Sequence, residues 1–555
     1  MDSQRLSLVV LVESYHKVMQ FSFNPNLRVS ARAVKTDKLW SLLVIGTIFF
    51  LTAIAISVSA QNISGKFEGT ADVQPFGKLP IKAEIRQKTN KFSGLFNTPL
   101  GDSAIIEGSF TAGNLKLIVD ADGSDIILDG NLSDGKFDGK VISERLNGTF
   151  ELTRIGDVSP EPDLSYVLSQ SKEKWHEDLR FVAEELPKRH KNAFHRVTRE
   201  QFDKAVVDLE SRIPNLDDVQ IVLEISKLFT MIGDGHTDLQ WSSAYNFVPI
   251  RLFWFGKELR VYRADEHSSR LIGAKLIKIG GVTVEEIFKR SQPFIAQDES
   301  PQYVFSANAY RLSFPAFLHA LGVAKSANSA VYEFVDIKGK SFSIELKTVA
   351  RDDKSLRNYP FKNLPLWLQD RDKDLVFKYL PDSKTVYVKF QSYPRRKEFK
   401  QFSDELFAFL DKTEVKKLVF DMRLNEGGDF TRGQDYFINP LKERKNLTEK
   451  GRLFVIAGRW TFSAGMSNTA HFRNEFGAIL VGEPTGARPN GYQEVRSFRL
   501  PNSHLEGSYS IELYKFADQD TAGLIPDRLI EPDWKSFQLG RDSALEWILS
   551  YPKKK

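Results

Sequence analysis

The stretch of sequence that decides the fold runs KLVFDMRLNEGGD over residues 417–429. Its apolar start, which ends at Asp421, has the pattern of a strand buried inside a sheet. A polar turn ending in Gly427 and Gly428 follows directly. Two glycines after a strand allow backbone N–H groups to point at one position, where they can hold an anion or a developing oxyanion. Many turns of this kind have no function, so the motif needs a partner elsewhere in the chain.

Further apolar strands are expected on both sides of this motif, at residues 385–390, 453–457 and 478–481. A helical pattern lies between the first two, over residues 402–410. Alternation of strands and helices is typical of a sheet covered by helices. We therefore expect an α/β domain over residues 380–550.

A second motif, RWTFSAGM, occupies residues 459–466 between an apolar strand and a helical pattern. A serine at such a junction lies at the positive end of the helix dipole, and its small neighbours Ala464 and Gly465 leave its hydroxyl accessible. This logic is that of a nucleophile elbow, with Ser463 as the nucleophile. The alternative is that Ser463 only caps the helix, a frequent role of serine at this position.

Taken together, these motifs and three later segments resemble the C-terminal processing peptidase family, which includes the tail-specific proteases and the core of the tricorn protease. The later segments are VGEPTG, LPNS and IPD, at residues 481–486, 500–503 and 525–527. The resemblance covers residues from about 170 to 540. It implies a catalytic domain built as a ClpP/crotonase-like spiral of β-β-α units.

The resemblance also implies the parts of a serine peptidase site. Ser463 would be the nucleophile, and the N–H of Ala464 would form an oxyanion hole with an N–H of the Gly427-Gly428 turn. Such a site hydrolyses a peptide bond through an acyl-enzyme. The implied activity is therefore that of a serine-type endopeptidase.

The general base needs a separate argument, because similar tail-specific proteases use a lysine where this chain has Arg488. Arginine does not give up its proton in a protein. Histidine titrates near neutrality, and His236 lies in GDGHT, which resembles the Asp-Gly-His-Thr box of the tricorn-like branch. His236 is therefore the expected base, with a capping role near a helix end as the alternative. His504 is a weaker candidate, and His471 is expected to pack.

A carboxylate that orients the base is implied by the same branch of the family. The corresponding residue here is Asp520, in the segment QDTAGLIPD at residues 519–527. A carboxylate bonded to an imidazole fixes its tautomer and stabilises the imidazolium. An aspartate that merely lies in a loop is the alternative.

The chain before residue 380 is expected to fold as three further units. Short alternating strands over 61–155 predict an antiparallel meander or small barrel with a structural or docking role, ligand binding at a barrel mouth being the alternative. Two amphipathic helices, expected from the apolar spacing at 175–186 and 221–232, occupy 165–245 together with the GDGHT turn, and Gly233 is expected to cap the second helix. Residues 246–375 are strand-rich, and LIGAKLIKIGGVTV at 271–284 resembles the core of a degenerate PDZ domain.

The N-terminal extension, residues 1–60, contains an uncharged apolar segment at 39–60. Basic residues precede this segment, and it ends in Val58-Ser59-Ala60. This arrangement predicts a signal peptide, with an uncleaved membrane anchor as the alternative. We therefore expect an exported protein, located in the cell envelope or periplasm or secreted.

The composition is that of an ordinary globular protein of several domains. The 555 residues exceed the ~250–300 that a single core supports. A net charge of +5 over this length does not indicate a nucleic-acid partner. The chain has no cysteine, no P-loop and no His-Glu-x-x-His motif, so we expect no metal or cofactor and a peptide or protein as substrate.

Two non-catalytic functions compete with the peptidase hypothesis. Retinoid-binding relatives of the family hold a hydrophobic ligand on the same scaffold, and the aromatic residues at 253–255 with Trp460 could line such a site. Alternatively, an inactive enzyme could present its β domain to a partner in the cell envelope. Only the peptidase requires Ser463, His236 and the Gly-Gly turn together.

Overall fold

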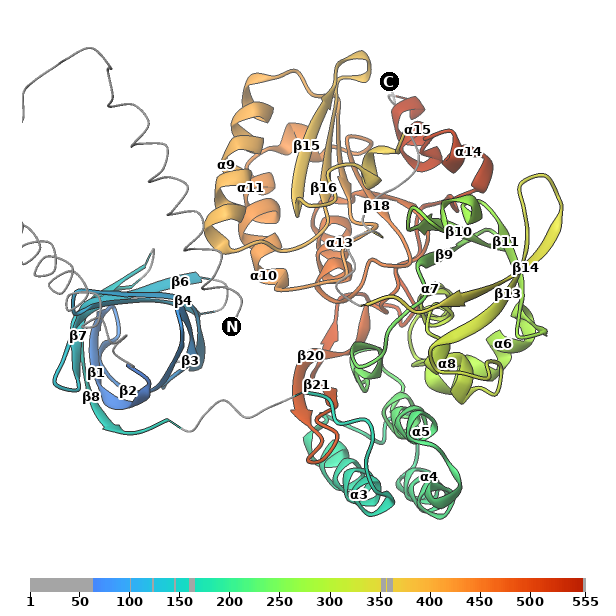
Figure 1. The fold of residues 1–555 in the computed structure, drawn as a ribbon. Helices are drawn as coiled ribbons and strands as arrows, with labels where there is room; N and C mark the ends of the chain where they lie inside the picture. The colour runs from blue at the N-terminus through green and yellow to red at the C-terminus, as the bar shows by residue number, and fades with distance from the viewer. Residues whose placement is uncertain are drawn as a thin grey trace, which may run out of the picture.

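The computed structural model describes residues 63–552 except 100, 122–123, 144–145, 159–164, 351–355 and 357–362. The described chain forms an N-terminal β-barrel and a larger α/β body (Figure 1). The expected signal peptide at 39–60 lies outside the described residues. No helix among the described residues is long and apolar enough to cross a membrane.

The barrel consists of eight antiparallel strands, each paired with the next, and it closes because the last strand pairs with the first. The strands are β1 Gly65–Gln74, β2 Gly77–Lys88, β3 Lys91–Thr98, β4 Gly101–Thr111, β5 Asn114–Ala121, β6 Ser124–Ser133, β7 Lys136–Ile142 and β8 Asn147–Gly156. Closure leaves no unpaired edge. In β1, the alternation of buried Ala71 and Val73 with exposed Asp72 separates the interior from the solvent face.

Three helices form the subdomain that follows the barrel: α3 Lys172–Arg189, α4 Arg199–Arg212 and α5 Asp218–Thr230. Capping boxes start α4 at Thr198 and α5 at Asp217. The sequence interpretation identified α3 and α5 but not α4. It also assigned Gly233 as the cap of α5, which is wrong, because α5 ends at Thr230 with Met231 as its C-cap. Gly233, with φ +114°, shapes the next turn instead.

A second sheet has the strand order β14-β13-β11-β10-β9, with β12 paired to β11. Helices interrupt this region, which the sequence interpretation described only as strand-rich. Its elements are β9 Ile250–Phe255, β10 Glu258–Ala264, β11 Lys275–Ile279, β12 Val282–Thr283, α6 Val284–Ser291, α7 Pro301–Arg311, α8 Pro315–Ala320, β13 Ser329–Val335 and β14 Ser341–Lys347.

The C-terminal sheet has the order β15-β16-β17-β18-β19-β22, parallel from β16 onward, with β15 antiparallel at one edge. The strands are β15 Leu375–Leu380, β16 Thr385–Phe390, β17 Lys417–Asp421, β18 Leu453–Ala457, β19 Ile479–Gly482 and β22 Arg528–Leu529. The predicted strands at 385–390, 417–421 and 453–457 therefore have the expected bounds, and the fourth starts one residue later than expected.

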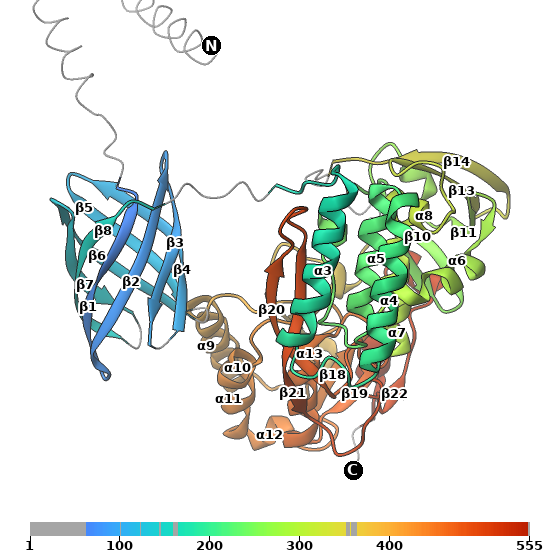
Figure 2. The ribbon, with the colours of Figure 1, turned by 90° about the horizontal axis from the view of Figure 1, so that it is seen from below.

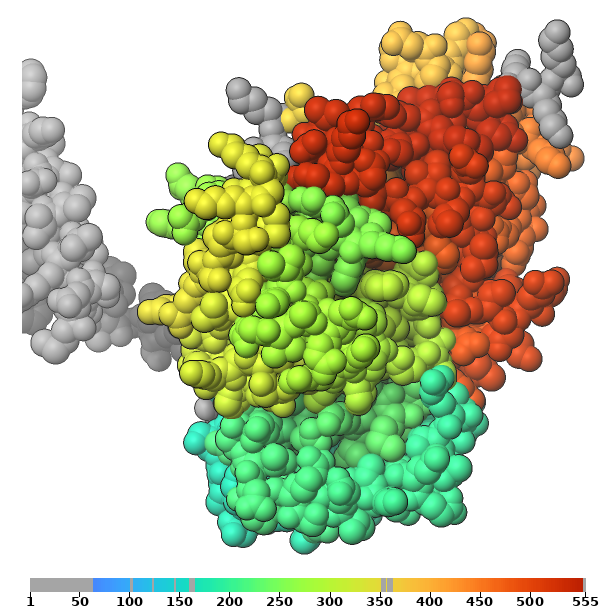
Figure 3. All heavy atoms as spheres, turned by 90° about the vertical axis from the view of Figure 1, so that its right-hand side faces the viewer, coloured from blue at the N-terminus to red at the C-terminus, as the bar shows by residue number. Residues whose placement is uncertain are grey.

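Helices cover both faces of this sheet, as expected for a buried parallel sheet. The helix predicted at 402–410 is longer, α9 Arg396–Lys412, and packs on one face with α13 Ser463–Phe476. The opposite face packs against α15 Ser543–Ser550. The shorter helices are α10 Phe430–Gly433, α11 Asn439–Lys442, α12 Lys445–Thr448 and α14 Trp534–Gln538. Figure 3 shows how closely the helical subdomain, the second sheet and the C-terminal segments pack on one face of the body.

A two-stranded ribbon, β20 Asn490–Arg499 and β21 Glu506–Lys515, extends from the C-terminal domain along the helical subdomain (Figure 2). The Gln240 N–H donates to the Glu506 carbonyl (2.8 Å), and the Ser508 N–H donates to the Asp238 carbonyl (2.8 Å). The ribbon therefore holds the segment around His236 beside the C-terminal domain, although more than 250 residues separate the bonded partners.

A buried ion network fixes the end of β17. Arg423 Nε donates to Asp421 Oδ1 (3.0 Å), and Arg423 Nη1 donates to Asp542 Oδ1 (3.1 Å). Tyr387 Oη donates to Asp421 Oδ2 (2.7 Å). Burial alone would lower the pKa of Arg423, but the two carboxylates outweigh it and raise that pKa well above its ordinary value. The Asp-x-Arg part of the motif is therefore structural, and it also anchors the start of α15.

Replacing Arg423 with methionine should destabilise the body strongly, because two buried carboxylates would lose their shared cation. The expected loss is about 3–5 kcal/mol, measured by urea unfolding or as a lowered melting temperature. The matched control is Arg541→Met, which removes an exposed ion pair with Glu546 and should barely change stability. Equal effects of the two substitutions would contradict the structural role of Arg423.

Candidate active site

Ser463 is the first residue of α13, directly after the loop that follows β18. Its φ of +46° lies in the left-handed region, which a serine rarely adopts without a local constraint. The N-cap of α13 is Phe462, and no side chain caps this helix end. The capping alternative for Ser463 is therefore wrong. The half-buried hydroxyl is not used to hold the helix end.

The two sequence motifs are bonded to each other around this serine. The Phe462 N–H donates to the Asn425 carbonyl (2.9 Å). Thr461 Oγ1 donates to the Met422 carbonyl (2.8 Å) and accepts a bond from the Gly458 N–H (3.0 Å). The turn after β17 and the start of α13 therefore form one rigid unit, and the spacing of about 40 residues between the motifs reflects this contact.

The Gly-Gly turn makes the closest approach to Ser463. Gly427 and Gly428 have φ angles of +121° and +147°, which favour glycine. A Cβ on Gly427 would lie 2.6 Å from the Cβ of Ser463 and 3.1 Å from its Oγ. A Cβ on Gly428 would lie 2.7 Å from the ring of Tyr393. Both glycines are therefore required by conformation and by space.

Two backbone N–H groups near Ser463 remain available to a ligand. The Gly427 N–H donates to Asn425 Oδ1 (3.1 Å), so it fixes the turn and is not a free oxyanion donor. The amides of Gly428 and Ala464 make no hydrogen bond among the described residues. Ala464 is in the first turn of α13, where amides lack an intrahelical partner and the helix dipole favours negative charge. Of the expected oxyanion residues, Gly428 and Ala464 have the free donors.

His236 lies beside the serine's neighbour but is not hydrogen-bonded to the serine. Its ring stacks on that of Phe462, with centroids 4.8 Å apart. Both ring nitrogens are buried and lack a hydrogen-bond partner among the described residues. Burial lowers the pKa of His236, opposed by the charge of Asp234 and the backbone of Tyr492. The neutral imidazole is therefore favoured, with a nitrogen able to accept a proton.

Asp234 holds the turn that carries His236. Its Oδ1 accepts bonds from the His236 N–H (3.2 Å) and Ser510 Oγ (2.7 Å), and its Oδ2 lies 3.0 Å from His190 Nε2. Burial raises the pKa of Asp234, but these bonds and the charge of His190 outweigh it, and the pKa is lowered. The aspartate of the GDGHT segment thus positions the backbone of His236 rather than its ring.

Glu299 is a functional candidate that the sequence interpretation missed. Its Oε1 accepts a bond from the Gly235 N–H (2.9 Å), and its Oε2 accepts one from the Arg488 N–H (2.9 Å). Burial raises its pKa to about 7, against the two backbone bonds. Glu299 joins the His236 turn to the segment after β19. No local motif marks this residue, because its role depends on two distant segments meeting at its carboxylate.

Asp520 does not occupy the expected orienting position. Its carboxylate pairs with Arg488 Nη2 (2.7 Å), and its side chain is 64% exposed. Neither nitrogen of His236 has a partner among the described residues, so no bond joins the two. The physical reason is the arginine at position 488, whose guanidinium attracts the nearby carboxylate toward solvent. The assignment of Asp520 as the residue that orients His236 is therefore corrected.

The remaining histidine candidates lie elsewhere. His471, on α13, packs against Phe430 and Phe516 and lies 3.0 Å from Gln434 Nε2, as expected for a packing residue. His504 lies 2.9 Å from the Ser165 carbonyl, at the far end of the ribbon. No group of three or more His, Asp or Glu side chains in the described chain could hold a metal ion.

The aromatic residues proposed for a retinoid-like site do not form one. Phe253 and Phe255 are buried in a core cluster with Trp367, Phe537 and partly buried Trp460. Trp254, on the other face of β9, packs against Phe288 and Phe305. Alternate residues of β9 thus pack into two different cores, because successive side chains of a strand point to opposite faces of the sheet.

Neither a protein-family model nor a curated protein sequence matches this chain. Similar solved structures include mature CPAF, at 11% identity over 69% of this chain and 99% of that one, with a TM-score of 0.47. The photosystem II D1 C-terminal processing protease has 14% identity over 68% and 99%, with a TM-score of 0.33. The tricorn protease has 12% identity over 85% of this chain and 45% of its own length, with a TM-score of 0.35.

The photosystem II and tricorn neighbours are proteases by name. What this chain itself can catalyse depends on the geometry of Ser463 and the groups around it.

The buried carboxyl of Glu299 should make stability depend on pH. Its folded-state pKa of about 7 exceeds the ordinary 4.5, so the folded protein binds this proton more tightly than the unfolded chain. The stabilisation of the folded state by this bound proton is fully present below pH 4.5 and is lost as pH rises to about 7. Relative to Glu299→Gln, the free energy of unfolding of the wild type should fall by up to about 3 kcal/mol as the pH rises across this window.

The measurement is the melting temperature of both proteins from pH 4.5 to pH 8. The exposed Glu285, replaced with glutamine in the same way, is the control and should leave the pH dependence unchanged. A constant difference between wild type and Glu299→Gln at every pH would show that Glu299 is ionised throughout.

Proposed function

We propose that this chain is a serine endopeptidase of the C-terminal processing type, in the tricorn-like branch, with Ser463 as nucleophile. The observation that carries the proposal is the approach of Gly427 to Ser463, which brings a strained serine to a Gly-Gly turn. The free amides of Gly428 and Ala464 flank this serine, as a tetrahedral intermediate requires. A serine with a purely structural role would need neither feature.

The first half-reaction forms the acyl-enzyme. Ser463 Oγ attacks the substrate carbonyl carbon while its proton passes to the neutral ring of His236. The carbonyl oxygen becomes negative and accepts bonds from the amides of Gly428 and Ala464. Each such donor is worth roughly 3–4 kcal/mol in comparable sites. The imidazolium then protonates the leaving amine as the C–N bond breaks.

The second half-reaction releases the product. Water gives a proton to the neutral His236, and its oxygen attacks the acyl carbon. The ester bond to Ser463 breaks, the serine oxygen takes back the proton held by His236, and the product leaves as a carboxylic acid, which loses its own proton to water. The transfer requires His236 to approach Ser463 Oγ, which is consistent with catalytic hydrogen bonds that tighten only once substrate is bound.

The base is positioned by its backbone. Asp234 and Glu299 accept bonds from the amides of His236 and Gly235, on consecutive residues of one turn. A Cβ on Gly235 would lie 2.7 Å from the ring of Phe462, so the turn is pressed against the loop that carries the serine. These contacts support His236 as the base without a carboxylate at its ring.

Four finer assignments belong to the same proposal. We assign the sheet β15–β22 to the ClpP/crotonase-like class, and the sheet β9–β14 to a degenerate PDZ-like domain. The substrate class is a peptide or protein. The apolar segment at 39–60 supports export to the cell envelope or beyond, with membrane association as the alternative if it is retained.

Labelling with a fluorophosphonate tests the nucleophile directly. Wild type should form a covalent adduct on Ser463 at neutral pH, and Ser463→Ala should not. Ser467→Ala removes the next hydroxyl along the same helix, which donates to the Ser463 carbonyl (3.3 Å), and should label normally. His236→Gln should slow labelling and peptide cleavage by roughly 10³-fold or more. Absence of any adduct on folded wild type would favour a non-catalytic protein.

Substituting Gly427 tests the approach of the turn to the serine. Gly427→Ala should abolish labelling, because the added methyl group overlaps Ser463 and the left-handed φ disfavours alanine. Gly339→Ala is the matched control: its φ is +85°, and nothing lies within 4 Å of the added Cβ. It should lose about 1 kcal/mol of stability and keep its activity. Full activity of Gly427→Ala would contradict the proposed site.

A further inference from the structure

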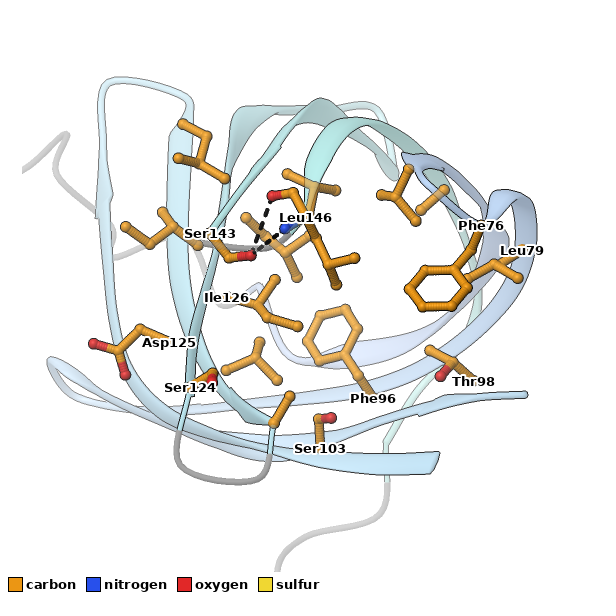
Figure 4. Close-up of a pocket in the computed structure, with 18 of the residues that line it drawn as sticks. Phe76, Leu79, Phe96, Thr98, Ser103, Ser124, Asp125, Ile126, Ser143 and Leu146 are labelled. Atoms are coloured by element: carbon orange, nitrogen blue, oxygen red, sulfur yellow. Dashed lines mark hydrogen bonds between the residues drawn. The ribbon is translucent and has the colours of Figure 1, made fainter. Parts of the chain in front are cut away.

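The N-terminal barrel encloses a cavity of about 1000 Å³ that the peptidase mechanism does not use. Aliphatic and aromatic side chains form most of its wall, among them Phe76, Leu79, Phe96 and Ile126 (Figure 4). Leu79, Phe96 and Ile126 come from three different strands and Phe76 from the turn between β1 and β2, and they converge on the space at the centre of the barrel. The volume matches that of pockets for small organic ligands.

The cavity occupies only part of the barrel, because the interior is packed elsewhere. Phe67, Phe137 and Phe150 are buried and do not line the cavity, and the rings of Phe137 and Phe150 touch edge to face at 4.6 Å. The cavity wall includes small side chains, such as Ala71 and Ala121, beside the larger ones. An eight-stranded barrel is either filled by side chains or holds one small ligand. In this barrel, side chains fill one part of the interior, and the other part has room for a small ligand.

Charged groups join the wall where the barrel meets the C-terminal domain. Arg395, Arg396 and Lys397, at the start of α9, line the cavity together with Asp125. Arg395 pairs with Asp125 and lies 3.4 Å from Asp120. Figures 1 and 2 both place the barrel next to α9. The lining therefore has three cationic side chains and one carboxylate at this mouth.

The ion pairs leave one of these cations available. Arg395 is engaged by the barrel, and Arg396 donates to Asp435 (2.8 Å) within its own domain. Lys397 is exposed and forms no ion pair among the described residues. An apolar cavity with a solvated ammonium group at its mouth suits a molecule that is apolar along its length and anionic at one end.

We propose that the barrel binds a single-chain anionic amphiphile of the long-chain fatty acid class. Its hydrocarbon chain occupies the cavity, and its carboxylate lies at the mouth beside Lys397. This site goes beyond the proposed peptidase activity and does not depend on it.

Binding can be measured with dansylaminoundecanoic acid and the full-length Ser463→Ala protein. The probe should bind one saturable site, and oleate should displace it. Ala71→Trp fills the cavity and should weaken binding by about tenfold or more. Asp72→Trp adds the same group to the outer face of the same strand and should bind as wild type. Equal binding by both variants, or no saturable binding at all, would overturn the proposal.

A second variant locates the ligand even if Ala71→Trp fails to fold. The barrel segment, residues 61–156, contains no tryptophan, so Phe96→Trp introduces a reporter into the cavity wall with little change in volume. Dibromostearic acid quenches nearby indole fluorescence. Quenching should increase relative to wild type in Phe96→Trp, and not in Asp72→Trp. An unchanged signal would place bound fatty acid outside the barrel and contradict the site.

The role of the mouth is tested separately from that of the cavity. Lys397→Glu should weaken the binding of oleate severalfold and leave the binding of oleyl alcohol unchanged. Only oleate carries a negative charge that can pair with Lys397. Binding of both molecules unchanged by this substitution would overturn the anionic-headgroup part of the proposal. The same variants, made with Ser463 intact, are also assayed for peptide cleavage. A failure of fatty-acid binding can then be distinguished from a failure of the peptidase hypothesis.

Discussion

The close contact between the turn after β17 and the start of α13 constrains the rest of the C-terminal domain. The Phe462 N–H bonded to the Asn425 carbonyl, with Gly427 against Ser463, leaves no room for a side chain between the two segments. The surrounding structure holds the two segments in position. Parallel strands bring both loops to the same sheet edge, and the buried Arg423 network fixes the strand end from which the turn starts. The left-handed conformation of Ser463 persists because the bonds and contacts of the neighbouring residues hold its backbone in place.

The proposed base reaches this centre by a different route. It belongs to the helical subdomain, and the β20–β21 ribbon of the C-terminal domain returns to bond the segment on either side of it. Buried carboxylates at positions 234 and 299 accept from the amides of that turn, so the polar backbone of the turn is satisfied without using the imidazole. Among the described residues, both ring nitrogens are thus left without hydrogen-bond partners next to Phe462, and buried polar groups without partners are rare in folded proteins.

The barrel differs in kind from the body. Its stability comes from a closed ladder of backbone bonds and from a core packed in only one part of its interior. The segment that contributes cations to its mouth starts two residues after Tyr393, whose ring packs against Gly428. One short segment, residues 393–397, therefore contacts both the Gly428 turn and the mouth of the cavity.

The sequence by itself determined four of the six strands of the C-terminal sheet, the repeated short strands of the barrel, and the positions of Ser463 and the Gly-Gly turn, each shortly after a strand. These features are local: apolar runs, turn pairs and glycines at positions where only glycine fits. Tertiary structure alone decided that the Gly427 amide is used internally, that Asp520 turns to Arg488, and that Glu299 accepts a bond from the turn that carries His236. It also decided that the barrel is hollow in one part. Such features depend on which distant groups meet in space, and side chains such as Arg488 and Asp520 choose partners only after the backbone has folded.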